Sequence, residues 1–138
     1  MYPPELVAPM NKELTERGFT GLETPEAVSE MLDKKEGTVL VVVNSVCGCA
    51  AAMARPGAVM AINGAEKKPD FITTVFAGVN KEATARAREY MHPYPPSSPS
   101  MALFKDGRLV HFIERHHIEG AQAEMIAQNL KMAFERFC

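Results

Sequence analysis

Apolar residues near the start of the chain recur every three or four positions, which is the spacing of one face of a helix. This pattern predicts two helices, over residues 1–18 and 24–37. The second is sharply delimited, because Thr24 is a favourable N-cap and Pro25 suits the first helical position. The predicted inward-facing residues are Leu6, Met10 and Leu14 in the first helix and Ala27, Val28, Met31 and Leu32 in the second.

Short apolar runs further along the chain predict strands. Residues 38–44, TVLVVVN, are mostly β-branched and do not alternate with polar residues, which is typical of a strand buried on both faces. A second strand is predicted over residues 70–78, and residues 101–114 are expected to form a hairpin that turns at Asp106-Gly107. The remaining helices are predicted over residues 50–63 with an interruption at Pro56, over residues 80–91 with Asn80 as cap, and over residues 119–137 with Met125, Ile126, Leu130, Ala133, Phe134 and Phe137 inward.

After the two leading helices, the elements follow the order βαβαββα, which is the order of a thioredoxin fold. The sequence therefore predicts an α/β protein with a central mixed sheet and helices on both faces. A crossover helix between strands indicates parallel pairing, and the closing hairpin adds an antiparallel edge. Residues 1–138 are expected to form a single thioredoxin-like domain, with residues 1–37 as an N-terminal helical extension packed on it.

Composition and charge narrow the function without defining it. The 138 residues include 15 lysines and arginines and 17 acidic residues. The basic residues are interleaved with acids, so no nucleic-acid partner is expected. No apolar run approaches the roughly 20 residues of a membrane helix, and the N-terminus lacks the pattern of a signal peptide. Because the chain has only three cysteines, two of them close together, a reducing cytoplasmic location is expected.

Two cysteines stand where the strand of residues 38–44 should turn into a helix. Cys47 and Cys49 are separated only by Gly48. Unpaired backbone N–H groups and the positive end of the helix dipole favour a thiolate at this place. The sequence therefore predicts that Cys47 is a nucleophile with a lowered pKa. Gly48 is expected to let the backbone bend tightly and to leave the site open to a bulky substrate.

A proline-rich stretch, HPYPPSSPS, precedes the predicted hairpin. In thioredoxin-like sites a cis-proline lies just before the third strand and packs against the redox cysteines. The Ser98–Pro99 bond is therefore predicted to be cis, which proline makes accessible. The backbone around Pro99, including Ser98 and Ser100, is expected to pair with an extended substrate peptide.

Four stretches together resemble the bacilliredoxin family. The resemblance covers nearly the whole chain, although the motif is Cys-Gly-Cys rather than the Cys-x-x-Cys of thioredoxin, and Val46 stands where thioredoxin has tryptophan. The stretches are NSVCGCAAAMARPG, MHPYPPSSPSMALFKDG, RHHIEGAQAEMIAQNL and the terminal AFERFC.

The resemblance implies a thiol-disulfide oxidoreductase that removes bacillithiol from protein mixed disulfides. It implies that Cys47 attacks and takes the bacillithiol, and that Cys49 is the second thiol of the motif. No bound cofactor and no metal are expected, and bacillithiol or a similar low-molecular-weight thiol would be the co-substrate. The implied partners are client proteins with mixed disulfides and a recycling reductase.

Two other functions are open at this point. A Cys-Gly-Cys disulfide closes a small ring that reaches the preferred dihedral with difficulty. Strain in this ring would favour reduction of the disulfide. The reduction potential of the Cys47–Cys49 pair is therefore predicted to lie nearer the roughly −180 mV of a disulfide isomerase than the roughly −270 mV of thioredoxin. Alternatively, Cys47 and Cys49 could ligate a metal together with Cys138 and a histidine, or hold an iron–sulfur cluster.

Several residues around the motif are candidates for substrate binding. Arg55 and Arg115 could pair with the carboxylates of bacillithiol's malate end, since a guanidinium binds a carboxylate in a fork. Asn44 and Ser45 could contact the thiolate or cap the helix. Cys138 is a candidate resolving thiol, with an inert chain end as the alternative. His116 and His117 are expected in a solvated loop.

Overall fold

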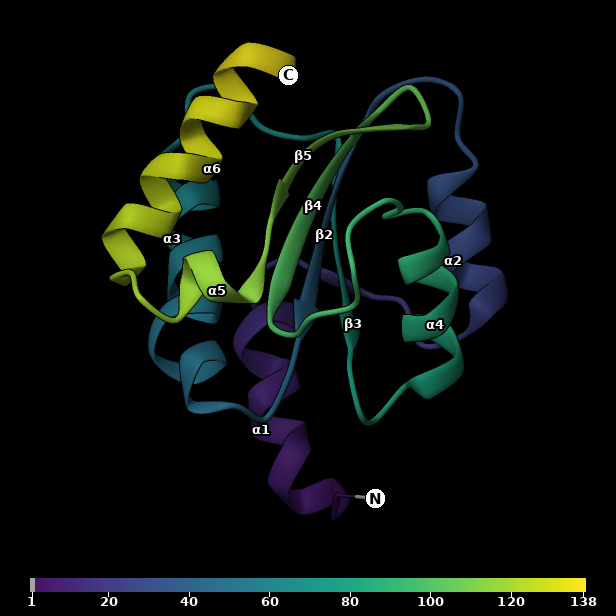
Figure 1. The fold of residues 1–138 in the computed structure, drawn as a ribbon, viewed down its shortest axis with the longest axis vertical. Coiled ribbons are helices and arrows are strands. Elements are labelled where there is room, and N and C mark those ends of the chain that lie inside the picture. Colours follow the sequence, from purple (N-terminus) through teal and green to yellow (C-terminus); the bar gives the residue numbers. More distant parts are fainter. Residues whose placement is uncertain (1) are drawn as a thin grey trace.

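The computed structural model describes residues 2–138. Within this range, five strands form one mixed sheet in the order β1-β3-β2-β4-β5 (Figure 1). β2 is central, parallel to β3 and antiparallel to β4. The strands are β1 (Thr20–Gly21), β2 (Thr38–Asn44), β3 (Phe71–Phe76), β4 (Ser100–Lys105) and β5 (Arg108–Ile113).

Helices cover both faces of the sheet (Figure 1). On one face α1, α3 and α6 pack against Leu40 and Val42 of β2. On the other face α2 and α4 pack against Val39, Val41 and Val43. Successive side chains of a strand point to opposite faces, so the unbroken apolar run of β2 supplies both layers of the core. The helices are α1 (Pro4–Thr15), α2 (Pro25–Leu32), α3 (Arg55–Gly64), α4 (Lys81–Glu89), α5 (Arg115–Ile118) and α6 (Ala123–Phe137), and a π-helical turn (Ala50–Ala54) precedes α3.

The predicted α/β order and the thioredoxin-like layers are confirmed, with one correction to strand direction. The crossover through α3 gives the expected parallel pairing of β2 and β3, but α4 leads to a strand that is antiparallel to β2. The reason is the loop of residues 90–99, which returns the chain to the end of β2 before β4 begins (Figure 1). Ser100 therefore lies opposite Val43.

The helix cap, the hairpin turn and the helix interruption lie where the sequence predicts them. The Thr24 hydroxyl accepts a hydrogen bond from the backbone N–H of Ala27 at 3.1 Å, which caps α2. The hairpin turns at Asp106 and Gly107, whose φ angles of 51° and 82° have the positive sign that such a tight turn needs. Pro56 lies in the first turn of α3, directly after the π-helical turn, and so divides this helical stretch as expected.

Four details of the predicted elements were wrong. Residues 1–37 contain the strand β1 in addition to the predicted helices. The first turns of α1 extend beyond the sheet (Figure 1). In these turns Leu6 is exposed, and Val7 is buried in its place. The last helix begins at Ala123, because residues 115–118 form the separate helix α5. Met125 is 59% exposed, since α6 packs through the neighbouring face that contains Ile126.

None of the helices in residues 2–138 is both long and apolar enough to span a bilayer.

Candidate active site

A buried arginine holds the segment that joins β2 to the cysteines. Arg55 is only 2% exposed, and its Nη1 donates to Asn44 Oδ1 and to the Ser45 carbonyl, both at 2.9 Å. Its Nε lies 3.2 Å from a carboxylate oxygen of Glu13 on α1. Asn44 is 1% exposed and also donates through Nδ2 to the carbonyl of Met10. Arg55 and Asn44 are therefore buried beneath the segment that joins β2 to Cys47, which corrects their prediction as substrate-binding residues.

The two cysteine sulfurs of the motif lie side by side as free thiols. Their Sγ atoms are 3.1 Å apart, and the backbone N–H of Cys49 donates to Cys47 Sγ at 3.3 Å. A hydrogen bond from the Cys49 thiol lowers the pKa of Cys47 most, and the backbone N–H of Cys49 lowers it further. The same hydrogen bond raises the pKa of Cys49. The direction for Cys47 matches the expectation, and backbone N–H groups contribute as expected, but the largest cause is the neighbouring thiol.

Arg115 connects the cysteines to two other parts of the chain. Its Nη2 lies 3.2 Å from Cys47 Sγ, and its Nη1 donates to the Ser98 carbonyl at 3.1 Å. Its Nε pairs with Glu119 at 3.2 Å, and the same carboxylate oxygen lies 4.0 Å from Cys49 Sγ. The positive charge of Arg115 also lowers the pKa of Cys47. One side chain thus contacts the nucleophilic sulfur and the residue before Pro99.

The segment before β4 contains the predicted cis peptide. The Ser98–Pro99 bond is cis, as expected, and the His92–Pro93 bond is also cis. The Ser98 carbonyl is occupied by Arg115 rather than free for a substrate peptide. Ser100 is 1% exposed and its hydroxyl donates to the Ser97 carbonyl, so its side chain is unavailable to a ligand.

Ser45 and Gly48 differ in how they shape the loop. Ser45 Oγ accepts from the backbone N–H of Cys47 at 3.3 Å and is largely buried, so it caps the turn. Gly48 does not have a positive φ, and a Cβ built on it would meet no heavy atom within 4 Å. A tight bend therefore does not require glycine here, which corrects that expectation, whereas the expected openness of the site is present.

A depression of about 380 Å³ opens beside Cys47. Arg88, on α4, also lines this depression and was not predicted as a site residue from the sequence. Nothing in the pattern KEATARAREY distinguishes it from Arg86. The lining residues are Tyr2, Ser45, Val46, Cys47, Ala77, Gly78, Arg88, Ser98 and Arg115.

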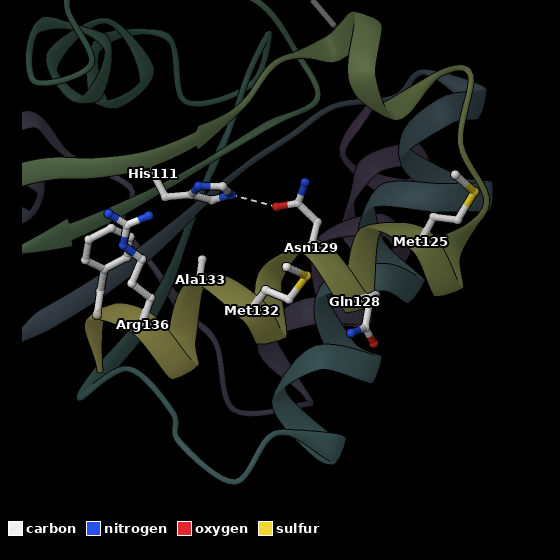
Figure 2. Close-up of a pocket in the computed structure, with 8 residues that line it drawn as sticks. His111, Met125, Gln128, Asn129, Met132, Ala133 and Arg136 are labelled. Atoms are coloured by element: carbon white, nitrogen blue, oxygen red, sulfur yellow. Dashed lines mark hydrogen bonds between the residues drawn. The ribbon is translucent and has the colours of Figure 1, made fainter.

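A second hollow of about 400 Å³ lies between α6 and β5, as Figure 2 shows. Its polar contact joins His111 Nε2 to Asn129 Oδ1 at 2.6 Å. None of the cysteines lines it. This hollow is therefore separate from the paired thiols of Cys47 and Cys49.

Cys138 lies at the opposite end of the molecule from the motif (Figure 1). Its thiol lies near Thr38, the first residue of β2, whereas Cys47 comes after Asn44, the last residue of that strand. At a strand rise of about 3.3 Å per residue, the ends of β2 are separated by about 20 Å. This distance contradicts the resolving role within one chain and the metal set of Cys47, Cys49 and Cys138.

The histidine pair occupies α5 rather than a loop. The backbone N–H of Glu114 donates to His117 Nδ1, which forms part of a capping box at the start of this helix. Ligand atoms of Glu114, His116 and His117 lie within 4.8 Å of one another on the surface. The contacts of Glu114 and His117 are those of a helix cap, and no cysteine belongs to this group.

Comparison with known proteins agrees with this geometry. A family model described as "Disulphide isomerase" matches residues 2–138. A bacilliredoxin of Cytophaga hutchinsonii is 60% identical over 98% of both chains. The chain belongs to the bacilliredoxin family. Other bacilliredoxins include those of Halalkalibacterium halodurans, at 57% identity over 99% of this chain and 94% of that protein, and of Bacillus cereus, at 56% over 99% and 95%.

Solved structures place the bacilliredoxin fold with the thioredoxins. Fasciola hepatica thioredoxin superposes with a TM-score of 0.59 at 19% identity, covering 87% of this chain and all of the other. Reduced Schistosoma mansoni thioredoxin pre-protein gives 0.61 at 15% identity, covering 87% and 98%. Family membership, this fold and the paired thiols make the protein a thiol-disulfide oxidoreductase.

Proposed function

We propose that this member of the bacilliredoxin family removes bacillithiol from protein mixed disulfides through attack by Cys47. The observation that carries the proposal is the convergence of three donors on one sulfur. The Cys49 thiol, the Cys49 backbone N–H and the Arg115 guanidinium all lie within 3.3 Å of Cys47 Sγ. Donors to a sulfur stabilise its thiolate, which is the attacking species in thiol-disulfide exchange.

The first step exchanges one disulfide for another without net oxidation. The Cys47 thiolate attacks the bacillithiol sulfur of the client's mixed disulfide, and the bond between that sulfur and the client's cysteine breaks. The client leaves as a thiolate and takes a proton from water. Cys47 then carries the bacillithiol as a mixed disulfide.

Two routes complete the cycle. In one, the thiolate of a second bacillithiol attacks the bound bacillithiol sulfur, which releases bacillithiol disulfide and restores the Cys47 thiolate. In the other, Cys49 loses its proton to water and attacks Cys47 Sγ, 3.1 Å away in the reduced protein. Bacillithiol then leaves as a thiolate, and a recycling reductase supplies two electrons to the Cys47–Cys49 disulfide.

The description of the matching family as a disulphide isomerase supports a second activity. An isomerase uses the same nucleophile, but Cys47 attacks a sulfur of the client itself. Another client thiolate then displaces Cys47, so that the client's disulfides are rearranged without net electron transfer.

The location of the protein, its cofactor requirement and its domain organisation are also part of the proposal. We propose a cytoplasmic site of action, where thiols are kept reduced, and no prosthetic group, because the exchange needs only thiols and a proton acceptor. We also propose that residues 1–138 act as one domain, since α1 and α2 each contribute to a layer of the core on the shared sheet.

Trapping the first intermediate tests the proposal. A Cys49→Ser variant incubated with a bacillithiolated peptide is expected to retain bacillithiol on Cys47, which intact-mass measurement detects. A Cys47→Ser variant provides the control and is expected to remain unmodified. Transfer of the peptide rather than the bacillithiol to Cys47, together with reactivation of a scrambled client, would favour the isomerase. Absence of both adducts would refute both.

A further inference from the structure

Arg88 is a cation whose charge is not balanced inside the protein. Its Nε is buried without a hydrogen-bond partner, and its Nη2 makes a single long contact of 3.5 Å with the Ser97 carbonyl. Among residues 2–138, no carboxylate lies within ion-pair distance of it. Arg88 as a whole is only partly buried. Removing part of its charge from water without a counter-charge is unfavourable, and burial accordingly lowers the pKa of Arg88.

The same depression contains the second guanidinium and the nucleophile. Arg88 and Arg115 line it together with Cys47, and they contact the carbonyls of the successive residues Ser97 and Ser98. None of the lining residues in the described part of the chain is acidic, but Glu119, outside the lining, pairs with Arg115 through its Nε. Arg88 therefore supplies the positive charge that has no carboxylate partner within residues 2–138. A guanidinium binds a carboxylate through two parallel hydrogen bonds. The depression is thus a cationic pocket beside a sulfur.

We propose that Arg88 and Arg115 form a carboxylate-binding subsite that selects low-molecular-weight thiols with anionic groups close to their sulfur. The proposal rests on the proposed function and assigns Arg88 a specificity role in it. The volume of about 380 Å³ suits a small molecule rather than a protein segment, since small-molecule sites measure about 300–1,000 Å³.

The subsite also determines which sulfur of a mixed disulfide is attacked. A small thiol whose carboxylates contact Arg88 and Arg115 has its own sulfur beside Cys47, and the client's sulfur points outward. Cys47 then forms its new bond to the small thiol's sulfur, and the client's thiolate is the leaving group. Binding in this pocket therefore favours removal of the small thiol over attack on the client.

A pair of matched mixed disulfides tests this selection. One peptide with a single cysteine is coupled either to mercaptosuccinate, which carries two carboxylates, or to 2-mercaptoethanol, which carries none. Arg88→Ala is expected to slow exchange of the mercaptosuccinate disulfide about tenfold, the loss of roughly one charge-assisted hydrogen-bond pair. Exchange of the 2-mercaptoethanol disulfide is expected to stay unchanged. Arg88→Gln, which keeps the shape of the chain, is expected to behave like Arg88→Ala.

Arg86→Ala is the matched control, because Arg86 is on the same helix but faces Ser29 and Glu89. It is expected to alter neither rate. Equal slowing of both disulfides by Arg88→Ala, or no slowing, would overturn the subsite. A third substrate carries an aspartate next to the cysteine of the peptide. If the effect of Arg88→Ala follows that aspartate rather than the small thiol, the pocket binds the client and the proposal is wrong.

Direct binding separates this inference from the proposed function. Malate, which has the carboxylates but no thiol, is titrated into the reduced protein while the Arg88 Nε–Hε resonance is followed by NMR. A saturable shift that is lost in Arg115→Ala supports the subsite even if Cys47 exchanges with neither disulfide. If exchange occurs but malate leaves the resonance unmoved, the proposed function stands and the subsite is refuted.

Discussion

Replacing Arg55 with alanine is expected to destabilise the whole protein, because this side chain joins α1, the end of β2 and the start of α3. The substitution removes two hydrogen bonds of 2.9 Å, to Asn44 Oδ1 and to the Ser45 carbonyl. It also removes the pairing with Glu13. The Ser45 carbonyl loses this charged donor, and a cavity replaces a side chain that is 2% exposed.

The size of this destabilisation depends on how well the former partners of Arg55 are satisfied without it. A hydrogen bond to a charged group contributes about 1.5–3 kcal/mol, and breaking a buried ion pair from one side costs about 3–5 kcal/mol. The lower end applies here, because Glu13 is 47% exposed and regains water when Arg55 is lost. Asn44 Oδ1 also keeps its hydrogen bond from the Ser45 N–H. We therefore expect a loss of about 3 kcal/mol in the free energy of unfolding.

Urea unfolding followed by circular dichroism measures this loss, with Arg86→Ala as the control. Arg86 is exposed and paired with Glu89 on the surface, so its removal is expected to cost less than about 1 kcal/mol. If Arg55→Ala is no more destabilising than Arg86→Ala, the contacts of Arg55 do not stabilise the segment between β2 and Cys47, and the reasoning is refuted.

Three further outcomes are expected. Cys47 alkylation should persist to pH values below the ~8.5 of a free thiol and decline as the pH falls through its lowered pKa. Arg115→Ala should move this inflection to higher pH, and mass spectrometry that finds one inflection for Cys47 and Cys49 would contradict the assignment. Cys138→Ser should leave exchange rates unchanged, because its thiol lies at the far end of β2; a loss of activity would imply a partner chain. Redox titration should give a potential nearer about −180 mV than −270 mV, and a value at or below the latter would refute the ring-strain argument.

The features that the sequence predicted correctly depend on short stretches of chain. The unbroken apolar run of β2 requires two buried faces, and the Thr24 cap and the Asp106-Gly107 turn are set by neighbouring residues. The placement of the cysteines at the end of a buried strand is equally local. Such features follow from backbone geometry and from side-chain propensities within one or two turns of the chain.

The features that the sequence did not reveal depend on tertiary contacts. Arg55 and Arg88 are indistinguishable from surface arginines in the sequence. Arg55 nevertheless contacts α1 and the end of β2, and Arg88 lines the depression beside Cys47. The direction of β4 depends on the course of the loop of residues 90–99, and the distance of Cys138 depends on the packing of α6. No local pattern specifies these arrangements.

Gly48 separates access to the sulfurs from the stability of the fold. Neither its backbone angle nor any neighbouring atom demands glycine in the reduced protein. A side chain can therefore be added at this exposed position, which directly follows Cys47 in the chain. A series through alanine, valine and phenylalanine would increase the bulk beside the two sulfurs in steps. The bacilliredoxin scaffold therefore offers one position at which the size of the accepted disulfide can be engineered.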